Sequence, residues 1–204
     1  MRMRKKKHGT ERLEACGDII IQSGEDIKST PVILEIGCGK GKFISELACR
    51  NKDKCFIGLE KVSDVLLIAA EKVKSAEITN VNFIVDDVKN LNNYLGEKSV
   101  SCIYLNFSDP WSKKGYHKRR LTYKTFLDIY KTVLADNGVI FMKTDNRGLF
   151  EFSIEQLSEN GFDVRNVTYD LHNSPYAEDN IMTEYESNFV SQGLPIHRLE
   201  AYLL

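Results

Sequence analysis

A buried strand that runs into a glycine-rich turn and then into a helix constrains this chain more than any other feature. The strand is predicted over Val32–Ile36, the turn Gly37–Gly41 follows it, and apolar spacing predicts a helix from Lys42 to Cys49. Such a unit favours a right-handed crossover into a second, parallel strand. With 204 residues, the chain is long enough for one α/β domain built from units of this kind.

The same alternation continues to the end of the chain. Six further strands are predicted over residues 56–60, 81–85, 100–107, 139–142, 162–169 and 196–204. Asn137-Gly138 is predicted to close the helix before the fifth strand, and Asn146 to cap the helix after it. The pattern predicts an α/β fold with a mostly parallel sheet. Residues 31–204 are expected to form this domain, after a basic amino-terminal arm and lead-in segment over residues 1–30.

Composition excludes several classes of protein. Hydrophobic residues make up 42% and charged residues 28%, which is typical of a globular domain and not of a disordered chain or a coiled coil. No apolar run approaches the roughly 20 residues that cross a bilayer, and no apolar segment follows the basic start. The five cysteines contain no CxxC pair, which favours reduced thiols over disulfides or a zinc site. We therefore expect a cytoplasmic protein with no membrane partner and no metal.

Two basic clusters interrupt a chain whose net charge is only -1. Together they allow a polyanionic partner at one face of the molecule. Either cluster taken alone is explained more simply as a solvated loop or a frayed terminus, so both interpretations stay open at this point. The clusters are the amino-terminal arm, with Arg2, Arg4 and Lys5, and the loop after residue 112, with Lys118, Arg119 and Arg120.

Acidic side chains recur where the predicted strands end. Because the carboxyl ends of parallel strands meet at one edge of a sheet, these acids are expected to gather where ligands bind in such folds. One acid alone is typical of a turn or a helix cap, but a succession of strand ends is not explained by turns. The acids are Glu35, Glu60, Asp86 with Asp87, Asp109 and Asp145.

The details of the glycine turn indicate which cofactor it suits. A dinucleotide fingerprint requires a glycine where this chain has Lys42, and a P-loop requires Ser or Thr where it has Phe43. Glu35, just before the turn, would repel a pyrophosphate and attract a cationic group. S-adenosylmethionine carries a sulfonium and an ammonium but no phosphate, so it suits a turn with Gly37 and Gly39 beside this acid.

Two further acids fit the same cofactor. Glu60 lies about 20 residues after the glycine turn, where an acid accepts ribose hydroxyls in folds of this kind. The neighbouring Asp86 and Asp87 are both available for the adenine amino group. A tight turn with no ligand is the simpler interpretation of the glycines, but the placement of the acids favours a methyltransferase.

Several longer motifs are much more specific than the glycine turn. They are Leu34–Gly41, Tyr104–Trp111, Lys113-Lys114 with His117–Leu121, Thr144-Asp145 and Thr183–Glu186. Across essentially the whole chain they closely resemble the bacterial tRNA (guanine-N7-)-methyltransferase family. The resemblance implies a Rossmann-like class I methyltransferase, with a seven-stranded, mostly parallel sheet, helices on both faces and an antiparallel C-terminal strand.

The resemblance also implies roles for individual residues. S-adenosylmethionine is expected to contact Glu35, Glu60, Asp87 and Asp109, with Asp87 preferred over Asp86 from its spacing after Glu60. The implied substrate is the variable-loop guanosine of tRNA, position 46. The residues expected to engage it are Lys113, Asp145, Thr183, Glu184, Tyr185 and Glu186. The sequence Ser112–Tyr116 departs from many relatives, which have a proline beside the tryptophan, so the conformation of this loop stays open.

The chemistry at guanine N7 narrows the catalytic requirement. N7 carries an in-plane lone pair and no proton, so methylation needs positioning and not a general base. A preorganised carboxylate would stabilise the positive charge that the purine gains, and Asp109 is the predicted group. Asp145 and Glu186 are predicted to accept hydrogen bonds from N1–H and the N2 amino group. A turn former is the simpler interpretation of Asp109, and a helix capping box the simpler interpretation of Thr183 with Glu186.

Two other functions remain open from the sequence. Asp109-Pro110-Trp111 is similar to the Asn/Asp-Pro-Pro-aromatic motif of methyltransferases that modify amines in other nucleic acids or proteins, but it lacks the second proline. A catalytically inactive RNA-binding module is the other alternative, and the intact Glu35 and Glu60 argue against it. The sequence is compatible with either a monomer or a homodimer.

Overall fold

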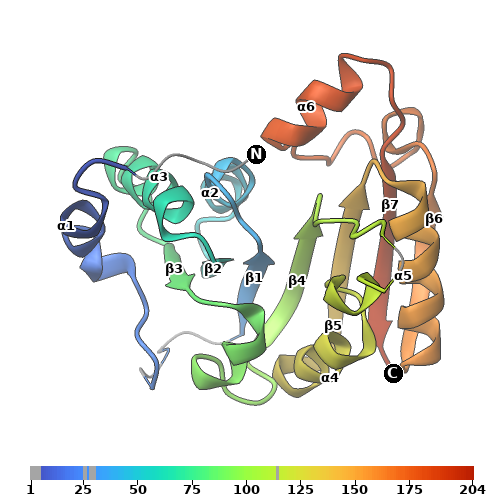
Figure 1. Cartoon of the computed structure of the whole chain (residues 1–204), viewed down its shortest axis with the longest axis horizontal. Coiled ribbons are helices and arrows are strands. Elements are labelled where there is room, and N and C mark those ends of the chain that lie inside the picture. The colour runs from blue at the N-terminus through green and yellow to red at the C-terminus, as the bar shows by residue number, and fades with distance from the viewer. Residues whose placement is uncertain (1–5, 25–26, 28–30, 114) are drawn as a thin grey trace.

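Seven strands form one sheet in the order β3-β2-β1-β4-β5-β7-β6 (Figure 1). The first five strands are parallel, and β7 runs antiparallel to both β5 and β6. This computed structural model describes residues 6–24, 27, 31–113 and 115–204. The predicted seven-stranded, mostly parallel sheet with an antiparallel C-terminal strand is confirmed. The strands are β1 Val32–Ile36, β2 Phe56–Glu60, β3 Val81–Val85, β4 Val100–Asn106, β5 Leu134–Thr144, β6 Phe162–Thr168 and β7 His197–Leu203.

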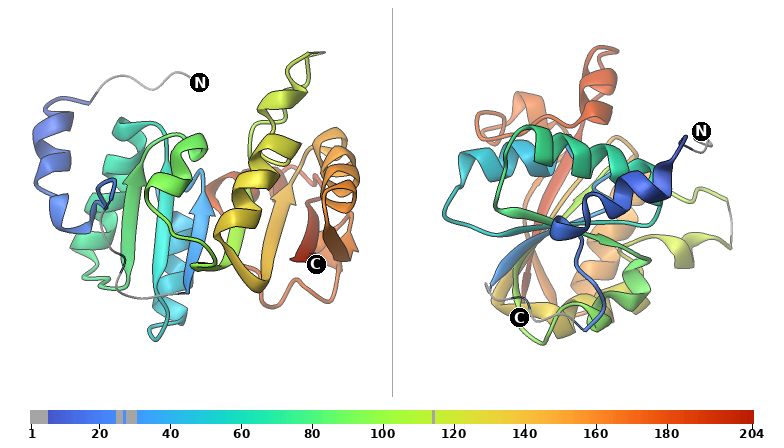
Figure 2. Two further views of the ribbon diagram at one scale, coloured as in Figure 1. Left: turned by 90° about the horizontal axis from the view of Figure 1, so that it is seen from below. Right: turned by 90° about the vertical axis from the view of Figure 1, so that its left-hand side faces the viewer.

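Helices cover both faces of the sheet (Figure 2). The apolar core is divided accordingly: Ile44 and Leu66 belong to one cluster, and Tyr130 and Phe150 to the other. Within the described ranges, no helix is long and apolar enough to cross a membrane. The α-helices are α1 Gly9–Glu14, α2 Lys42–Arg50, α3 Ser63–Ser75, α4 Lys124–Val133, α5 Arg147–Glu159 and α6 Glu184–Val190, and the 3-10 helices are η1 Gly17–Ile19, η2 Val88–Asn93, η3 His117–Arg119 and η4 Leu171–Asn173.

The described part of the lead-in segment packs beside α3 and β3. The Arg12 guanidinium donates two hydrogen bonds to the Glu71 carboxylate of α3, at 2.8 and 2.7 Å. The Ile21 amide donates to the Phe83 carbonyl of β3 at 2.8 Å. The segment thus covers part of an edge strand that would otherwise offer free backbone groups. The predicted RNA contacts of Arg2, Arg4 and Lys5 lie outside the described residues.

The end of α4 differs from the prediction. The helix ends at Val133, and Leu134 already pairs with Val100 as the first residue of β5. Asn137 has a φ of 61° and lies inside β5, where the register with β4 shifts. The prediction that Asn137-Gly138 closes the helix was therefore wrong, because such a pair suits a bulge as well as a helix end. The predicted cap of α5 is confirmed: the Asn146 side chain accepts a hydrogen bond from the Leu149 amide at 2.8 Å.

Candidate active site

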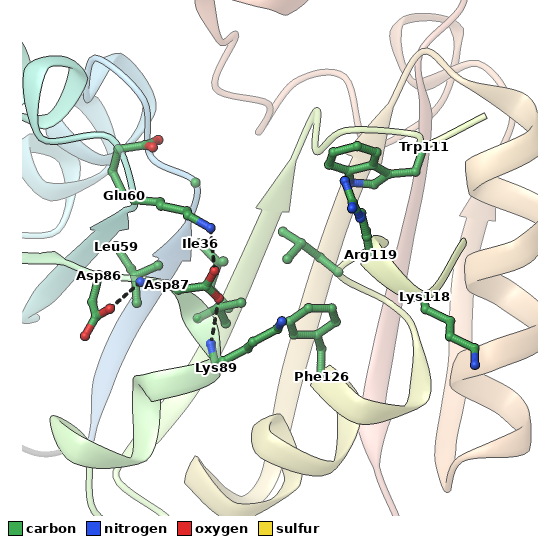
Figure 3. Close-up of a pocket in the computed structure, with 14 residues that line it drawn as sticks. Ile36, Leu59, Glu60, Asp86, Asp87, Lys89, Trp111, Lys118, Arg119 and Phe126 are labelled. Atoms are coloured by element: carbon green, nitrogen blue, oxygen red, sulfur yellow. Dashed lines mark hydrogen bonds and ion pairs between the residues drawn. The ribbon is translucent and has the colours of Figure 1, made fainter. Parts of the chain in front are cut away.

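Two adjoining cavities lie at the carboxyl ends of the central parallel strands. Their volumes are about 700 and 520 Å³. Because they share part of their lining, they form one groove at the edge of the sheet where ligands bind in α/β folds. Figure 3 shows the smaller cavity, with Trp111 and Arg119 opposite Glu60 and Asp87. The residues that line both cavities are Ile36, Gly37, Glu60, Trp111, Arg119 and Leu121.

Glu35 of β1 is a buried carboxylate that lines the larger cavity. One of its oxygens, Oε1, accepts a hydrogen bond from Asn106 Nδ2 of β4 at 2.9 Å, whereas the buried Oε2 makes no hydrogen bond of normal geometry. Burial raises the pKa of Glu35 to about 7, although the Asn106 hydrogen bond, the Lys143 charge and the Ile44 amide lower it. A buried oxygen without a partner is unfavourable, so this position suits a cationic ligand group such as the ammonium of S-adenosylmethionine.

The glycine turn leaves room for a ligand beside Glu35. Gly37 and Gly39 line the larger cavity with φ of 76° and 55°, and a Cβ at either position would meet no other atom within 4 Å. Gly41 differs, because a Cβ there would lie 2.7 Å from the Cβ of Ala69 on α3. Glycine is therefore required at Gly41 for the close approach of the turn to α3, while Gly37 and Gly39 expose backbone to the groove.

Glu60, the last residue of β2, connects the glycine turn to the start of α3. Its Oε2 accepts a hydrogen bond from the Gly39 amide at 3.2 Å, and its Oε1 accepts one from the Val62 amide at 2.9 Å. Glu60 lines both cavities. Since each carboxylate oxygen has two lone pairs, the residue can still accept hydroxyl donors from a ligand.

The neighbouring acids after β3 have different surroundings. Asp86 accepts hydrogen bonds from the Asp87 amide, Asn90 Nδ2 and Tyr94 Oη. The hydrogen bonds from Asn90 and Tyr94 hold the pKa of Asp86 below its usual value. Burial acts to raise the pKa of Asp87, but the hydrogen bonds from Lys61 and from the Lys89 amide, together with the charges of both lysines, outweigh it and the pKa is lowered. The Lys61 side chain is 71% exposed and can move aside. Both acids line the smaller cavity, and Asp87 is the one whose exposed lysine partner can be replaced by a ligand.

Asp109 lies in the exposed turn that follows β4, and it lines the larger cavity. The residues on either side of this turn, Phe107 and Trp111, have positive φ of 52° and 43°. Bulky side chains rarely adopt this conformation, and such strain is found mainly at functional sites. The Phe107 amide donates to the Lys143 carbonyl at 2.8 Å, which ties the start of the turn to β5.

The other side of the larger cavity is formed by the start of α6. Thr183, Glu184 and Tyr185 line it, whereas Glu186 is fully buried. The predicted capping box is confirmed: Thr183 Oγ1 accepts from the Glu186 amide at 3.0 Å, and Glu186 Oε2 accepts from the Thr183 amide at 3.2 Å. The Glu186 carboxylate also binds Lys143 and Asn180. Its predicted contact with guanine stays a prediction, since both oxygens already have partners in the chain.

Two predicted substrate residues lie outside the lining of the groove. Asp145 is half-buried directly after β5, and Lys113 is exposed in the loop after Trp111. Neither residue lines either of the two cavities. Their predicted roles therefore depend on a substrate that extends beyond the groove.

The basic loop contains one arginine that faces the groove and one that supports the loop. The Arg119 guanidinium lies over the rings of Trp111 and Tyr116, 4.9 and 4.7 Å from their centroids. Arg120 Nε donates to the Pro110 carbonyl at 2.8 Å, and its guanidinium lies 4.5 Å from the centre of the Phe152 ring. In Figure 3, Lys118 extends away from Arg119. Arg119 and Lys118 are thus more available to a polyanion than Arg120.

Two residues without a predicted role lie beside the site. Asn106 orients the Glu35 carboxylate, and Lys143 forms a buried ion pair with Glu186 at 2.7 Å. Both are polar residues near the end of an otherwise apolar strand. A polar residue at the end of an apolar strand is the pattern by which the acidic site residues were predicted. The same pattern would have pointed to Asn106 and Lys143.

Comparison with known proteins identifies the family. Residues 29–199 match the family model described as "Putative methyltransferase". A tRNA (guanine-N(7)-)-methyltransferase from Brevibacillus brevis is 48% identical over 173 residues, which cover 85% of this chain and 81% of the relative. The chain belongs to the tRNA (guanine-N(7)-)-methyltransferase family.

Family membership extends over nearly the full chain, and the fold agrees with it. The tRNA (guanine-N(7)-)-methyltransferase from Streptococcus pyogenes is 44% identical, with 98% of this chain and 99% of the relative covered. Among solved structures, a SAM dependent methyltransferase from Aquifex aeolicus superposes with a TM-score of 0.59 at 13% identity, covering 95% of this chain and 90% of that chain. That likeness shows the shared fold: a Rossmann-like methyltransferase sheet.

Proposed function

We propose that this chain transfers the methyl group of S-adenosylmethionine to N7 of guanosine in tRNA, at position 46 of the variable loop. The observation that carries the proposal is the buried Glu35, with one oxygen free to bind a cation, in a member of this family. A catalytically inactive RNA-binding module does not need a buried acid beside an open glycine turn, because RNA binding requires no cofactor. We place the reaction in the cytoplasm, as the cysteine pattern indicates.

The cofactor side of the groove is formed by β1, β2 and β3. When bound, S-adenosylmethionine supplies a methyl group on a positively charged sulfur. Glu35 binds the ammonium group and is held in orientation by Asn106. Glu60 accepts the ribose hydroxyls, and Asp87 faces the adenine amino group. Gly37 and Gly39 leave their backbone open to the ligand.

Catalysis on this account requires alignment and charge, without proton removal. N7 of guanine attacks with its own lone pair, so the groove has to hold this atom in line with the methyl group. The purine gains positive charge as the methyl is transferred, and the Asp109 carboxylate stabilises that charge. Asp109 lies in the strained turn between Phe107 and Trp111, a backbone conformation of the kind that is maintained at functional sites.

The tRNA is bound by both sides of the groove and by the surface around it. Thr183, Glu184 and Tyr185 contact the target nucleotide from the start of α6. Asp145, outside the lining of the groove, accepts hydrogen bonds from an edge of guanine that extends beyond the groove, and Lys113 meets a phosphate. The phosphate backbone is followed by Lys118 and Arg119, with support from Arg120 and from Arg2, Arg4 and Lys5 of the arm.

Nucleoside mapping tests this function. Purified protein is incubated with an unmodified tRNA transcript and S-adenosylmethionine, and the product is digested and identified by mass spectrometry. We expect 7-methylguanosine at position 46, and no product from a matched transcript in which that guanosine is replaced by adenosine. Methylation of another nucleoside or of protein would contradict the substrate assignment, and absence of cofactor binding would favour the inactive binding module.

A further inference from the structure

Lys143 carries a positive charge and follows the apolar part of strand β5 that lies in the core. It lies next to the end of β5, and its side chain is only 8% exposed. In the sheet it is paired with Asn106 of β4 and Arg198 of β7. No step of the proposed reaction uses this ammonium, and burying it is unfavourable unless its donors are satisfied.

Three acceptors surround the Lys143 ammonium, and all belong to one stretch of chain that leads into α6. Nζ donates to Asn180 Oδ1 at 2.8 Å, to the Ile181 carbonyl at 2.9 Å and to Glu186 Oε2 at 2.7 Å. An ammonium has three N–H donors, so its full capacity is used. One side chain of the sheet therefore connects β5 to the segment at the substrate side of the groove.

Glu186 completes this connection from the helix. Its Oε1 accepts from Asn180 Nδ2 at 2.6 Å and lies 3.0 Å from His172 Nε2, and its Oε2 also accepts from the Thr183 amide. The side chain has no exposed surface. Glu186 therefore faces the interior, whereas the three residues before it, Thr183, Glu184 and Tyr185, face the larger cavity.

The short helix α6 depends on this polar attachment. A helix of seven residues is too short to be stable by itself. Glu186 is the buried side chain of the helix, and Phe189 adds a ring contact with Phe107 at 6.1 Å between centroids. In Figure 1, α6 lies beyond the carboxyl ends of the parallel strands, and Glu184 and Tyr185 at its start line the larger cavity. The ion pair and the capping box thus hold its first residues from the interior, while Glu184 also lies 3.3 Å from Lys40 of the glycine turn at the surface.

We propose that Lys143 is a positioning residue for methyl transfer: through Glu186 it holds Thr183, Glu184 and Tyr185 against the cofactor side of the groove. The proposal rests on the proposed function and assigns Glu186 to anchoring this segment and not to contacting guanine. Lys143 lines neither of the two cavities. Its effect on the reaction passes through the placement of α6.

A double-mutant cycle tests the proposal. Lys143→Met removes the ammonium but keeps a long side chain, and it leaves Glu186 as a buried charge without its cation. We expect the single-turnover rate at saturating tRNA and S-adenosylmethionine to fall by about a hundredfold, the loss that a misplacement of 1 Å can cause. Saturating cofactor separates this loss from any change in cofactor affinity, since the Lys143 charge also lowers the pKa of Glu35. Adding Glu186→Gln should restore the rate of Lys143→Met by about tenfold or more, because no unpaired charge then remains buried.

Two outcomes of the cycle would overturn the proposal. A Lys143→Met enzyme that transfers methyl at the wild-type rate would remove Lys143 from any positioning role. A double variant whose rate loss equals the product of the two single losses would show that Glu186 acts independently, as a direct guanine contact does. Lys52→Met is the matched control, since Lys52 lies in the exposed loop after α2 and should behave as wild type.

Hydrogen exchange separates this proposal from the proposed function, because it needs no substrate. Amides over residues 181–190 should exchange faster in Lys143→Met than in the wild type, while those of β1 and β2 should exchange at the same rate in both. Equal exchange over residues 181–190 would contradict the proposal, whichever substrate the wild-type enzyme methylates. If Lys143→Met does not fold, Asn180→Ala takes its place, since it removes one partner from each member of the pair. Wild-type transfer and wild-type exchange in that variant would overturn the proposal equally.

Discussion

Cofactor affinity should fall as the pH drops below 7, because the ammonium of S-adenosylmethionine binds the charged form of Glu35. Burial raises the pKa of this carboxyl to about 7 in the free protein, so about half of the molecules carry a proton there at pH 7. The bound ammonium favours the ionised form and lowers this pKa. Binding therefore releases a proton, and the affinity rises with pH until Glu35 is fully ionised in the free protein.

The size of the effect follows from this pKa. Well below pH 7 the dissociation constant should increase by about tenfold for each pH unit, and between pH 7.5 and 5.5 by about 25-fold in total. An α-amino group loses its proton at about 7.7–8.0, so affinity should decline again above pH 8. We expect the tightest binding in the narrow range between these two titrations.

Isothermal titration calorimetry with S-adenosylmethionine over pH 5.5 to 8.5 measures this profile. Repeating the titration in buffers of different ionisation enthalpy counts the protons released. Glu35→Gln should bind more weakly at pH 7.5 and lose the decline on the acid side, whereas Glu60→Gln should bind more weakly but keep it. An affinity that is independent of pH in the wild type, or an acid decline that persists in Glu35→Gln, would refute the role given to Glu35.

Three further results are expected. Glu60→Ala should weaken the binding of S-adenosylmethionine by about 1.5–3 kcal/mol, because the ribose hydroxyls lose a charged acceptor; unchanged affinity in calorimetry would exclude Glu60 from the site. Replacing Lys118 and Arg119 by alanine should lower the salt slope of tRNA binding by about 0.7–0.9 of a log–log unit for each phosphate that the protein no longer neutralises; an unaltered slope would leave both residues as solvated surface. Glu35→Gln should stabilise the fold at pH 8 by up to about 3 kcal/mol, because Glu35 has a pKa of about 7 in the folded protein and its ionisation destabilises the fold fully above that pH. This gain should shrink at pH 5, where Glu35 is protonated in the folded protein. Thermal denaturation at the two pH values would measure the difference.

The sequence predicted the frame of the site because that frame depends on local patterns. The glycine turn after β1 and the acids at the strand ends can be read from spacing alone, and Glu35, Glu60 and Asp87 do come together at one edge of the sheet. The capping box of Thr183 and Glu186 is likewise a pattern over four residues, and the structure contains it.

The sequence could not predict contacts between segments far apart in the chain. Lys143 and Glu186 are separated by 43 positions, and nothing local indicates that they form a buried pair. The same is true of Asn106 and Glu35, which meet because β4 lies beside β1. The positive φ of Phe107 also has no local signal, since its side chain disfavours that conformation and only the surrounding structure maintains it. Asn137-Gly138 fits a helix end as well as a bulge, and only the pairing of β4 with β5 decides between them.

If Asp109 promotes methyl transfer through its charge, single-turnover kinetics of Asp109→Asn at saturating tRNA and S-adenosylmethionine will show it most directly. The substitution keeps the shape of the side chain and removes the charge. The transfer rate should fall by about two to three orders of magnitude, with tRNA affinity nearly unchanged. Raising the pH should not restore the rate, since no proton is removed from N7. Transfer at close to the wild-type rate would contradict the claim, leave Asp109 as a turn former and move the search for the stabilising carboxylate to Asp145.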